Sequence, residues 1–299
     1  MKKIKKYPGI IVPVITIFNS DGSINCYKTK KFISHLVEKG VHGIFVAGGT
    51  GEYSLMTLEQ RKEIISIGIE ATKKTIPVFA GTGHHNTRIV IELSQFAEEQ
   101  GADGVIISLP HYPHVNEEGL YLHYKAIAEK VHIPKFIYNC PRQYVIDISP
   151  ITVAKLARNN YIQGIKDSHL NIDHTAEIIR LTNKKITIWT GYETKLLPAL
   201  CLGADGAVCT VSNLIPDVMV DIYNLYKEGK ISDAAKKQLS IFELCNLLSP
   251  YNRHDMQPLK EGIRLLGFEV GDALPPAQKV PKNIIDKIRL NLERINRKI

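Results

Sequence analysis

Short apolar runs, rich in β-branched residues and bounded by Gly or Pro, recur along the chain. Within each run the apolar positions are nearly continuous and do not alternate with polar ones, which is typical of parallel strands covered on both faces. We therefore expect eight buried strands, at residues 9–18, 43–49, 77–83, 104–110, 134–139, 164–168, 186–191 and 206–211.

Amphipathic segments separate these runs. Residues 27–40 place Phe32 and Leu36 on one helical stripe and end at Gly40, a residue type common at helix C-termini. Segments of the same character occupy residues 87–101, 119–131 and 149–160. Strand and helix alternate at intervals of roughly 20 to 35 residues, which predicts an α/β fold of the (β/α)8 or TIM barrel type.

The main structural alternative is an open, doubly wound sheet, but no GxGxxG motif follows the first predicted strand. After the eighth run the strand pattern stops, and the remaining residues have helical periodicity, notably at 217–229, 232–248 and 282–295. We predict that residues 1–229 form the barrel and that residues 230–299 form a C-terminal helical extension packed on it.

Composition narrows the function class. The chain has 299 residues, 44% of them hydrophobic, and a formal net charge of +8. Lysines alternate with acidic residues along helical faces, as in residues 58–74, and no arginine-rich block occurs, so we expect no nucleic-acid partner. The chain has no run of ~18 apolar residues and no signal-peptide pattern. We therefore expect no membrane association and a cytoplasmic location.

Cysteines and histidines give no sign of a metal site. The five cysteines form no CxxC pair, and we expect them to be small buried hydrophobic residues in a reducing compartment. Four histidines that follow predicted strands lack metal-ligand spacing on one helix. They are His84, His85, His111 and His114. We predict no bound metal.

Polar residues follow the predicted strands. In a barrel of this kind the segments after the strands share one mouth, where active sites lie. The polar segments are residues 48–52, 81–86, 111–114, 138–139, 166, 191–193 and 212–213. We expect them to face one cavity.

Lys166 ends a strand that reads as buried, directly after the apolar pair Gly164 and Ile165. Apolar surroundings disfavour the charged ammonium, so the pKa of such a lysine falls and leaves a free amine that can attack a carbonyl group. The alternative is a lysine paired with Asp167 or Glu193, or one that extends to the rim of the barrel. The sequence leaves both interpretations open.

Two nearby segments could support this chemistry. The phenol of Tyr138 could transfer protons to and from the reacting groups, and Thr50 could orient it by a hydrogen bond. Alternatively, Tyr138 is a half-buried aromatic residue that caps the barrel. The GGTGE segment, residues 48–52, could hold a carboxylate or phosphate through its backbone N–H groups, or it could be a tight turn. Glu52 could act as a carboxylate at a helix N-terminus.

The conjunction of these motifs resembles the pyruvate-dependent class I lyases and synthases typified by dihydrodipicolinate synthase and N-acetylneuraminate lyase. The resemblance covers nearly the whole chain and rests on segments in the family's order and near its spacing: PVITIFNSDGSIN, GGTGEYSLMTLEQR, AGTGHHNT, EEGLYLHYKAIAE, YNCP, GIKDS and GADGAVCTVSNLIP. The YNxP motif followed at this distance by GIKD is the specific signal.

The resemblance implies that Lys166 forms a Schiff base with pyruvate and that Tyr138 is the proton donor and acceptor. It also implies that Thr50 and the backbone of Gly49 hold the pyruvyl carboxylate, while Val208 lines the substrate site. Members of this family need neither a metal nor an organic cofactor, because the iminium serves as the electron sink. The family is commonly homotetrameric, a dimer of dimers.

Two departures separate this chain from the synthase branch. That branch has two hydroxyl residues in the loop where the first position here is Gly49, so the threonine link to the family's tyrosine relay is missing. Tyr112 matches the tyrosine that the synthases lend across a subunit contact. The arginine of the family's YNxPxR motif falls on Gln143, with Arg142 one place early. The synthase assignment is therefore ranked second.

The segments KEGIRLLG and ALPPA resemble the branch that cleaves 2-keto-3-deoxy sugar acids. We assign Gln143, Gly191 and Glu193 to the substrate site, where they would join His111, His114 and Tyr192 in binding a polyhydroxylated chain. The sequence thus predicts reversible cleavage of a 2-keto-3-deoxy sugar acid to pyruvate and an aldehyde. The alternatives are dihydrodipicolinate synthase, N-acetylneuraminate lyase, 5-keto-4-deoxy-glucarate dehydratase and a non-catalytic barrel that binds a sugar acid.

Overall fold

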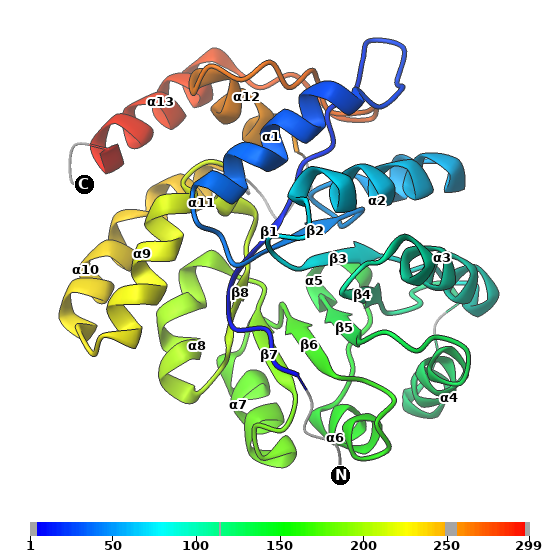
Figure 1. Cartoon of the computed structure of the whole chain (residues 1–299). Coiled ribbons are helices and arrows are strands. Elements are labelled where there is room, and N and C mark those ends of the chain that lie inside the picture. The colour runs from blue at the N-terminus through cyan, green and yellow to red at the C-terminus, as the bar shows by residue number, and fades with distance from the viewer. Residues whose placement is uncertain (1–4, 114, 249–255, 297–299) are drawn as a thin grey trace.

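The computed structural model describes residues 5–113, 115–248 and 256–296. Eight parallel strands lie at the centre with helices around them (Figure 1). The strands are β1 (Gly9–Pro13), β2 (Gly43–Val46), β3 (Val78–Gly81), β4 (Gly104–Ser108), β5 (Lys135–Asn139), β6 (Gly164–Asp167), β7 (Thr187–Thr190) and β8 (Gly206–Val208). Each pairs with the next, and β1 pairs with β8, so the sheet closes into a barrel. The prediction of a (β/α)8 barrel is confirmed.

The first strand is shorter than its apolar run. The run continues to Phe18, but β1 ends at Pro13, which has no N–H to donate to a neighbouring strand. Val14, Ile15 and Ile17 beyond it remain buried outside any strand. The Val14 N–H makes a last hydrogen bond to the Phe45 carbonyl of β2 at 2.9 Å. Continuous hydrophobicity therefore reports burial and extends beyond the end of strand pairing.

The helices around the barrel are α1 (Cys26–Glu38), α2 (Leu58–Thr72), α3 (Thr87–Gln100), α4 (Glu117–Ala128), α6 (Pro150–Arg158), α7 (Ile172–Thr182), α8 (Leu196–Leu202) and α9 (Pro216–Lys227). Local sequence fixes where several begin. Thr57 and Gln60 form a capping box at the start of α2, and Asn25, Asn116 and Ser149 accept backbone N–H groups at other helix starts.

Short helical turns at the carboxyl ends of strands position the polar loops. They are η1 (Tyr53–Leu55), α5 (Pro141–Tyr144), η2 (Glu193–Lys195) and η3 (Thr210–Asn213). The turn α5 has Pro141 in its first position, where the missing N–H costs nothing because no partner is available to it there. The sequence analysis did not predict these turns.

Aromatic side chains fill the inside of the barrel beneath its mouth. Tyr7, Phe79, Phe136 and Trp189 contact one another through edge-to-face or stacked rings with centroids 4.8–5.8 Å apart. The Trp189 indole also donates a hydrogen bond to the backbone carbonyl of Tyr7 at 2.7 Å. This solid floor closes one end of the barrel interior and leaves the carboxyl ends of the strands as the open side.

The C-terminal helices are α10 (Ile231–Ser240), α11 (Phe242–Leu248), α12 (Gln257–Leu265) and α13 (Lys282–Asn296). Residues 232–248 were predicted as one helical segment, but the helix is interrupted at Ile241, which caps α10. Helices α11 and α12 pack on α13, and α12 also contacts η3 (Figure 1). The later helices therefore lie against the loops that follow β8. The division of the chain at residues 229 and 230 stays a prediction.

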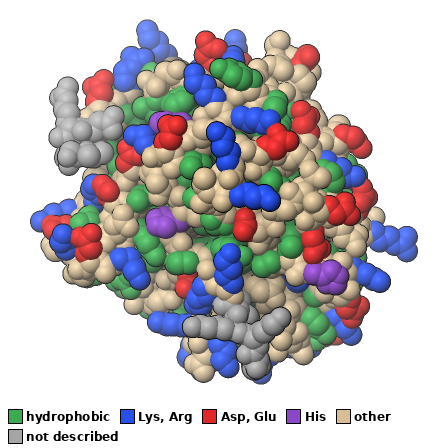
Figure 2. All heavy atoms as spheres, viewed as in Figure 1, with side chains coloured by type: hydrophobic (Ala, Val, Ile, Leu, Met, Phe, Trp, Pro, Cys, Tyr) green, Lys and Arg blue, Asp and Glu red, His purple; other side chains and the backbone are tan. Residues whose placement is uncertain are grey.

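Charged side chains of both signs are interspersed over the face drawn in Figure 2. Many form pairs, such as Lys62 with Glu92 at 2.6 Å. Within the described ranges, no helix is long and apolar enough to cross a membrane.

The expectation that all five cysteines are buried was wrong in part. Cys201 is exposed and Cys26 is partly exposed, whereas Cys140, Cys209 and Cys245 are buried.

Candidate active site

A cavity of about 330 Å³ opens at the carboxyl ends of the strands. Its lining residues come from the loops after several strands and from the C-terminal helices. They are Thr50, Tyr138, Cys140, Arg142, Gln143, Lys166, Ser168, Leu170, Gly191, Tyr192, Glu193, Thr194, Lys195, Thr210, Cys245, Asn246, Leu248 and Met256. Seven of the residues that the sequence assigned to the site are in this set, namely Thr50, Tyr138, Gln143, Lys166, Gly191, Tyr192 and Glu193.

Lys166 is buried on β6, with a relative exposure of 5%. Its Nζ lies 3.9 Å from the ring centroid of Tyr138 and 5.6 Å from that of Phe45. The two carboxylates considered as partners are bound elsewhere: Glu193 accepts the Val211 N–H at 3.0 Å, and Asp167 contacts α7. Among the described residues Lys166 has no ion pair with a carboxylate, so an aromatic and apolar environment surrounds its amine.

Burial lowers the pKa of Lys166 from 10.5 to about 8. At pH 7 about one amine in ten is then neutral, against about one in 3,000 for an unshifted lysine. The neutral amine is the nucleophile that Schiff-base formation requires. The cavity therefore presents a lysine that can react near neutral pH.

The pKa of Lys166 predicts the pH dependence of adduct formation. With subsaturating pyruvate, the rate constant should rise about tenfold per pH unit below pH 8 and level off above it, because only the neutral amine reacts. Reaction mixtures quenched into borohydride at one fixed pH would give these rates by mass spectrometry. A rate independent of pH between 6 and 9, or a midpoint near 10.5, would contradict the assignment.

Tyr138 lies next to Lys166 because β5 and β6 pair in a register that places the two residues opposite each other. Burial, with smaller contributions from Cys140, raises the pKa of the Tyr138 phenol well above 10.0. The phenol therefore carries its proton at neutral pH and donates toward the Gln143 Oε1 at 3.5 Å. A protonated phenol beside a neutral amine is suited to general acid–base catalysis.

Tyr144, at the end of α5, stands against the edge of the Tyr138 ring with centroids 5.9 Å apart. Its hydroxyl lies 3.3 Å from the Tyr53 hydroxyl, which is itself 3.3 Å from the hydroxyl of Ser108. The sequence analysis did not identify Tyr53 or Tyr144. Loop side chains such as these give no periodic signal before the fold brings them together.

Gly191 is required by close packing at the cavity wall. A Cβ atom at this position would lie 1.8 Å from the Ser168 Oγ and 3.2 Å from the Cε of Lys166. Any side chain would therefore displace the Ser168 side chain and crowd the stem of Lys166. Thr50 is also at the wall, but its hydroxyl lies 3.1 Å from that of Thr210, and the described contacts include none with the Tyr138 phenol.

Four described residues that the sequence assigned to the site do not line this cavity: Gly49, His111, Tyr112 and Val208. The His111 ring stacks on that of Tyr144, with centroids 5.1 Å apart. Gly49 lines an adjacent cavity of about 220 Å³ together with Glu52 and Met256. Val208 is buried in the barrel cluster that contains Tyr138. Tyr112 is 74% exposed, and its proposed role across a subunit contact stays a prediction. His114 lies outside the described residues. Within the described part of the chain, no group of three or more His, Cys, Asp or Glu is placed to hold a metal ion.

Glu52 anchors the GGTGE loop to the C-terminal helices. Its carboxylate pairs with Lys260 of α12 at 2.7 Å and accepts the Leu274 N–H at 2.7 Å. Lys260 is fully buried and also donates to the backbone carbonyl of Asp272 at 3.0 Å. Glu52 therefore forms an ion pair with a residue 208 positions later in the sequence. It does not act as a carboxylate at a helix N-terminus, the role considered above.

Replacing Lys260 with Met should lower the free energy of unfolding by about 3–5 kcal/mol, because the buried Glu52 carboxylate loses its partner. Urea denaturation followed by circular dichroism would measure the loss. The matched control is Lys236→Met, since Lys236 forms an exposed pair with Asp233 and its loss should leave the midpoint unchanged. Equal midpoints for the two variants would contradict a stabilising role for the buried pair.

Comparisons with known proteins agree with the motif resemblance. The model of the dihydrodipicolinate synthetase family matches residues 6–295. A 4-hydroxy-tetrahydrodipicolinate synthase of Clostridium novyi is 34% identical over 291 residues, covering 97% of each chain. A similar enzyme of Fervidobacterium nodosum is 32% identical over 286 residues, covering 94% of this chain and 97% of the relative.

Solved structures give the same result. YagE of Escherichia coli K12 is a prophage protein of the dihydrodipicolinic acid synthase family that was solved with pyruvate. It is 32% identical, has a TM-score of 0.91, and aligns over 97% of this chain and 99% of its own. Dihydrodipicolinate synthase of Thermotoga maritima is 26% identical with a TM-score of 0.93, over 98% and 99% of the two chains. The chain therefore belongs to the dihydrodipicolinate synthetase family and is a pyruvate-dependent class I lyase.

Proposed function

We propose that this enzyme condenses pyruvate with a short aldehyde that carries a carboxylate, the reaction of 4-hydroxy-tetrahydrodipicolinate synthase with aspartate semialdehyde. The Lys166 amine attacks the pyruvate C2 carbonyl, and loss of water gives an iminium. Removal of a methyl proton gives the enamine, whose carbon attacks the aldehyde. Tyr138 carries the protons. Attack on the iminium by water or by the amine of the product then frees Lys166.

The observation that carries this proposal is the position of Arg142. Although Arg142 lies one place before the arginine of the family motif, the turn α5 brings it to the same cavity wall as Lys166. Its guanidinium donates a hydrogen bond to the Tyr192 phenol. A guanidinium there can bind a carboxylate on the second substrate. The names of the curated relatives also support this reaction better than the sugar-acid cleavage that the sequence ranked first.

A second candidate is the reversible cleavage of a 2-keto-3-deoxy sugar acid. It is favoured by the polar wall that Gln143, Tyr192 and Glu193 provide, and by the absence of a hydroxyl at Gly49. Such side chains would form hydrogen bonds with a sugar acid that carries several hydroxyl groups. The two candidates share the Lys166 enamine and differ only in the aldehyde.

We propose that the enzyme acts in the cytoplasm as a homotetramer, a dimer of dimers, in which Tyr112 of one subunit reaches a neighbouring cavity. The exposure of Tyr112 supports this arrangement. Size-exclusion chromatography with light scattering would give the mass of the assembly, and a monomer at micromolar concentration would contradict it.

A substrate panel tests the proposed reaction. The purified enzyme would be assayed with pyruvate plus aspartate semialdehyde, with 2-keto-3-deoxygluconate, with N-acetylneuraminate and with 5-keto-4-deoxy-glucarate. The highest kcat/KM is expected with the semialdehyde. Dominant activity with 2-keto-3-deoxygluconate would establish the second candidate instead. Absence of turnover with all four, together with no borohydride-trapped pyruvate adduct, would leave a non-catalytic barrel.

A further inference from the structure

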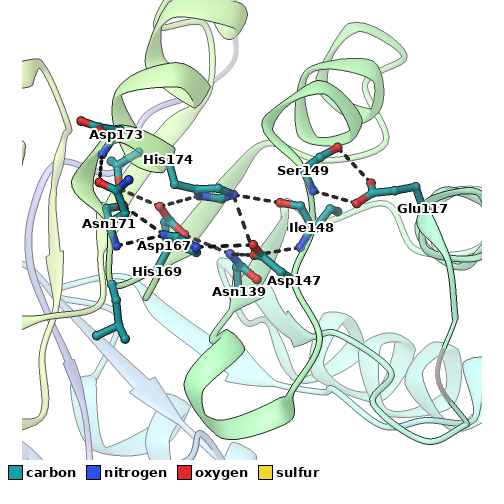
Figure 3. Close-up of polar contacts among 12 residues, drawn as sticks. Glu117, Asn139, Asp147, Ile148, Ser149, Asp167, His169, Asn171, Asp173 and His174 are labelled. Carbon is teal, nitrogen blue, oxygen red and sulfur yellow. Dashed lines mark hydrogen bonds and ion pairs between the residues drawn. The ribbon is translucent and has the colours of Figure 1, made fainter.

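A largely buried imidazole, that of His174, lies beside Asp167, the residue that follows Lys166 in the chain (Figure 3). His174 of α7 has a side-chain exposure of 9%, and both of its ring nitrogens face oxygen acceptors. Nδ1 lies 3.1 Å from the Oδ2 of Asp167, and Nε2 lies 3.0 Å from the backbone carbonyl oxygen of Ile148. The Oδ1 of Asp147 is 3.8 Å from the same Nε2.

A neutral imidazole has one N–H and could satisfy only one of these acceptors, whereas the doubly protonated ring satisfies both. A positive charge on His174 would stabilise the Asp167 carboxylate, because that side chain is fully buried and its other hydrogen-bond donors are neutral. These are the Thr175 hydroxyl at 2.6 Å and the Asn139 amide at 3.1 Å. The geometry thus favours an imidazolium between α7 and the end of β6.

The titratable and charged groups around the ring come from several elements: Asp167 of β6, Asp147 before α6, His169 after β6, Asp173 of α7 and Lys195 of η2. The His169 ring stacks on His174 with centroids 4.4 Å apart. Its Nδ1 lies 3.1 Å from both the backbone nitrogen and the carbonyl oxygen of Asn171, and its Nε2 lies 3.5 Å from the Oδ2 of Asp147. Two carboxylates, those of Asp147 and Asp167, therefore lie close to the His174 ring.

This cluster connects the loop between β5 and α6 to the strand of the reactive lysine. The Asn139 amide donates to both Asp147 at 2.7 Å and Asp167 at 3.1 Å. His174 makes a second link, from Asp167 to Ile148. At the far end of the loop, Ser149 is held by the Glu117 carboxylate of α4 at 3.0 Å. The segment between these anchors carries Arg142 and Gln143, which line the cavity.

We propose that protonated His174 is a positioning residue that holds the loop of Arg142 and Gln143 in place for the second substrate, so that affinity for the aldehyde falls when the ring loses its proton. This proposal rests on the proposed function only for the identity of the aldehyde. Formation of the pyruvate adduct involves Lys166 and should not depend on the loop.

The charges near His174 determine how its contact with Asp167 changes with pH. Burial lowers the pKa of His174, but the hydrogen bond and charge of Asp167 raise it more, and the net direction is upward from 6.5. Burial raises the pKa of Asp167, but its bond to His174 and its other donors lower it below 3.8. A raised pKa for His174 and a lowered pKa for Asp167 are both expected when the two groups form an ion pair. The contact is therefore complete below pH 6.5 and is lost as the pH rises through the higher pKa of folded His174.

The test separates the two substrates. In the wild-type enzyme, KM for the aldehyde should rise about tenfold with pH as His174 deprotonates, the loss expected for one charge-assisted hydrogen bond. In His174→Gln, this KM should already be about tenfold higher at pH 6 and should not change with pH. The rate of borohydride trapping with pyruvate should stay within about twofold of wild type. The control His132→Gln replaces an exposed histidine and should behave as wild type.

Three results would overturn the proposal. One is an unchanged pH dependence of the aldehyde KM in His174→Gln, and another is an equal loss of pyruvate trapping, which would indicate a general structural role. The third does not need the variant to fold: ¹⁵N NMR of the wild-type enzyme reports the charge of the imidazole, and a neutral His174 ring at pH 6 would exclude it. If pyruvate is not trapped at all, the proposed function fails, while the NMR titration still decides the state of His174.

Discussion

Lys166→Met is expected to abolish the trapped pyruvate adduct and to reduce turnover by a factor on the order of 10⁴ or more, because the substitution removes the amine that forms the iminium. Lys166 is the cavity lysine whose amine is buried among aromatic rings, with a pKa lowered by burial to about 8. Lys166→Arg should lose as much, since a guanidinium stays charged and cannot form the Schiff base. Mass spectrometry after borohydride reduction would measure the adduct.

The matched control is Lys135→Met. Lys135 is a buried lysine on the neighbouring strand β5, but it lies at the opposite end and donates to the backbone carbonyls of Val131 and Ile133. In this variant, the amount of trapped pyruvate adduct per folded molecule should equal that of the wild-type enzyme. An adduct that persists in Lys166→Met, located on another lysine, would remove Lys166 from its proposed role.

Tyr138→Phe is expected to lower turnover by a factor on the order of 10² to 10⁴ while the pyruvate adduct can still be trapped. The substitution keeps the ring that contacts the Lys166 amine and removes only the phenolic proton, so it separates proton transfer from packing. Steady-state kinetics and borohydride trapping on the same preparation would measure both effects.

Tyr124→Phe provides the comparison for this variant. The Tyr124 phenol is also buried, but it donates to the backbone carbonyl of Ile107 at 2.9 Å and does not line the cavity. Its loss should reduce stability by about 1 kcal/mol and leave turnover within a few-fold of wild type. Undiminished turnover in Tyr138→Phe would mean that another group carries the protons.

The two substrates should respond to pH in opposite directions. Formation of the pyruvate adduct should become faster as Lys166 loses its proton with a pKa of about 8. Affinity for the aldehyde should weaken as His174 loses its proton. We therefore expect a bell-shaped pH profile of turnover. Turnover should rise on the acidic side as Lys166 loses its proton, and fall on the basic side as His174 loses its proton and the contact to the loop is lost.

The hydrophobic pattern by itself determined the barrel and which residues end its strands. Parallel strands covered on both faces must be apolar throughout, so each one is visible in the sequence, and a charged residue at the end of such a run is conspicuous. This is why Lys166 could be singled out, and Tyr138 was noted because it is a polar residue at the end of the preceding strand. Their adjacency follows from the pairing of consecutive strands β5 and β6, a local rule of the fold.

Only the tertiary structure decided which groups surround the lysine. The turn α5 brings Arg142 to the cavity, Lys260 reaches Glu52 from α12, and His174 joins Asp167 to the next loop. These contacts depend on loop conformation and on side chains far apart in the chain, and no periodicity encodes them. The sequence reports burial through repeated apolar positions, whereas the partners of a buried charge are set by where the folded backbone places a few single residues.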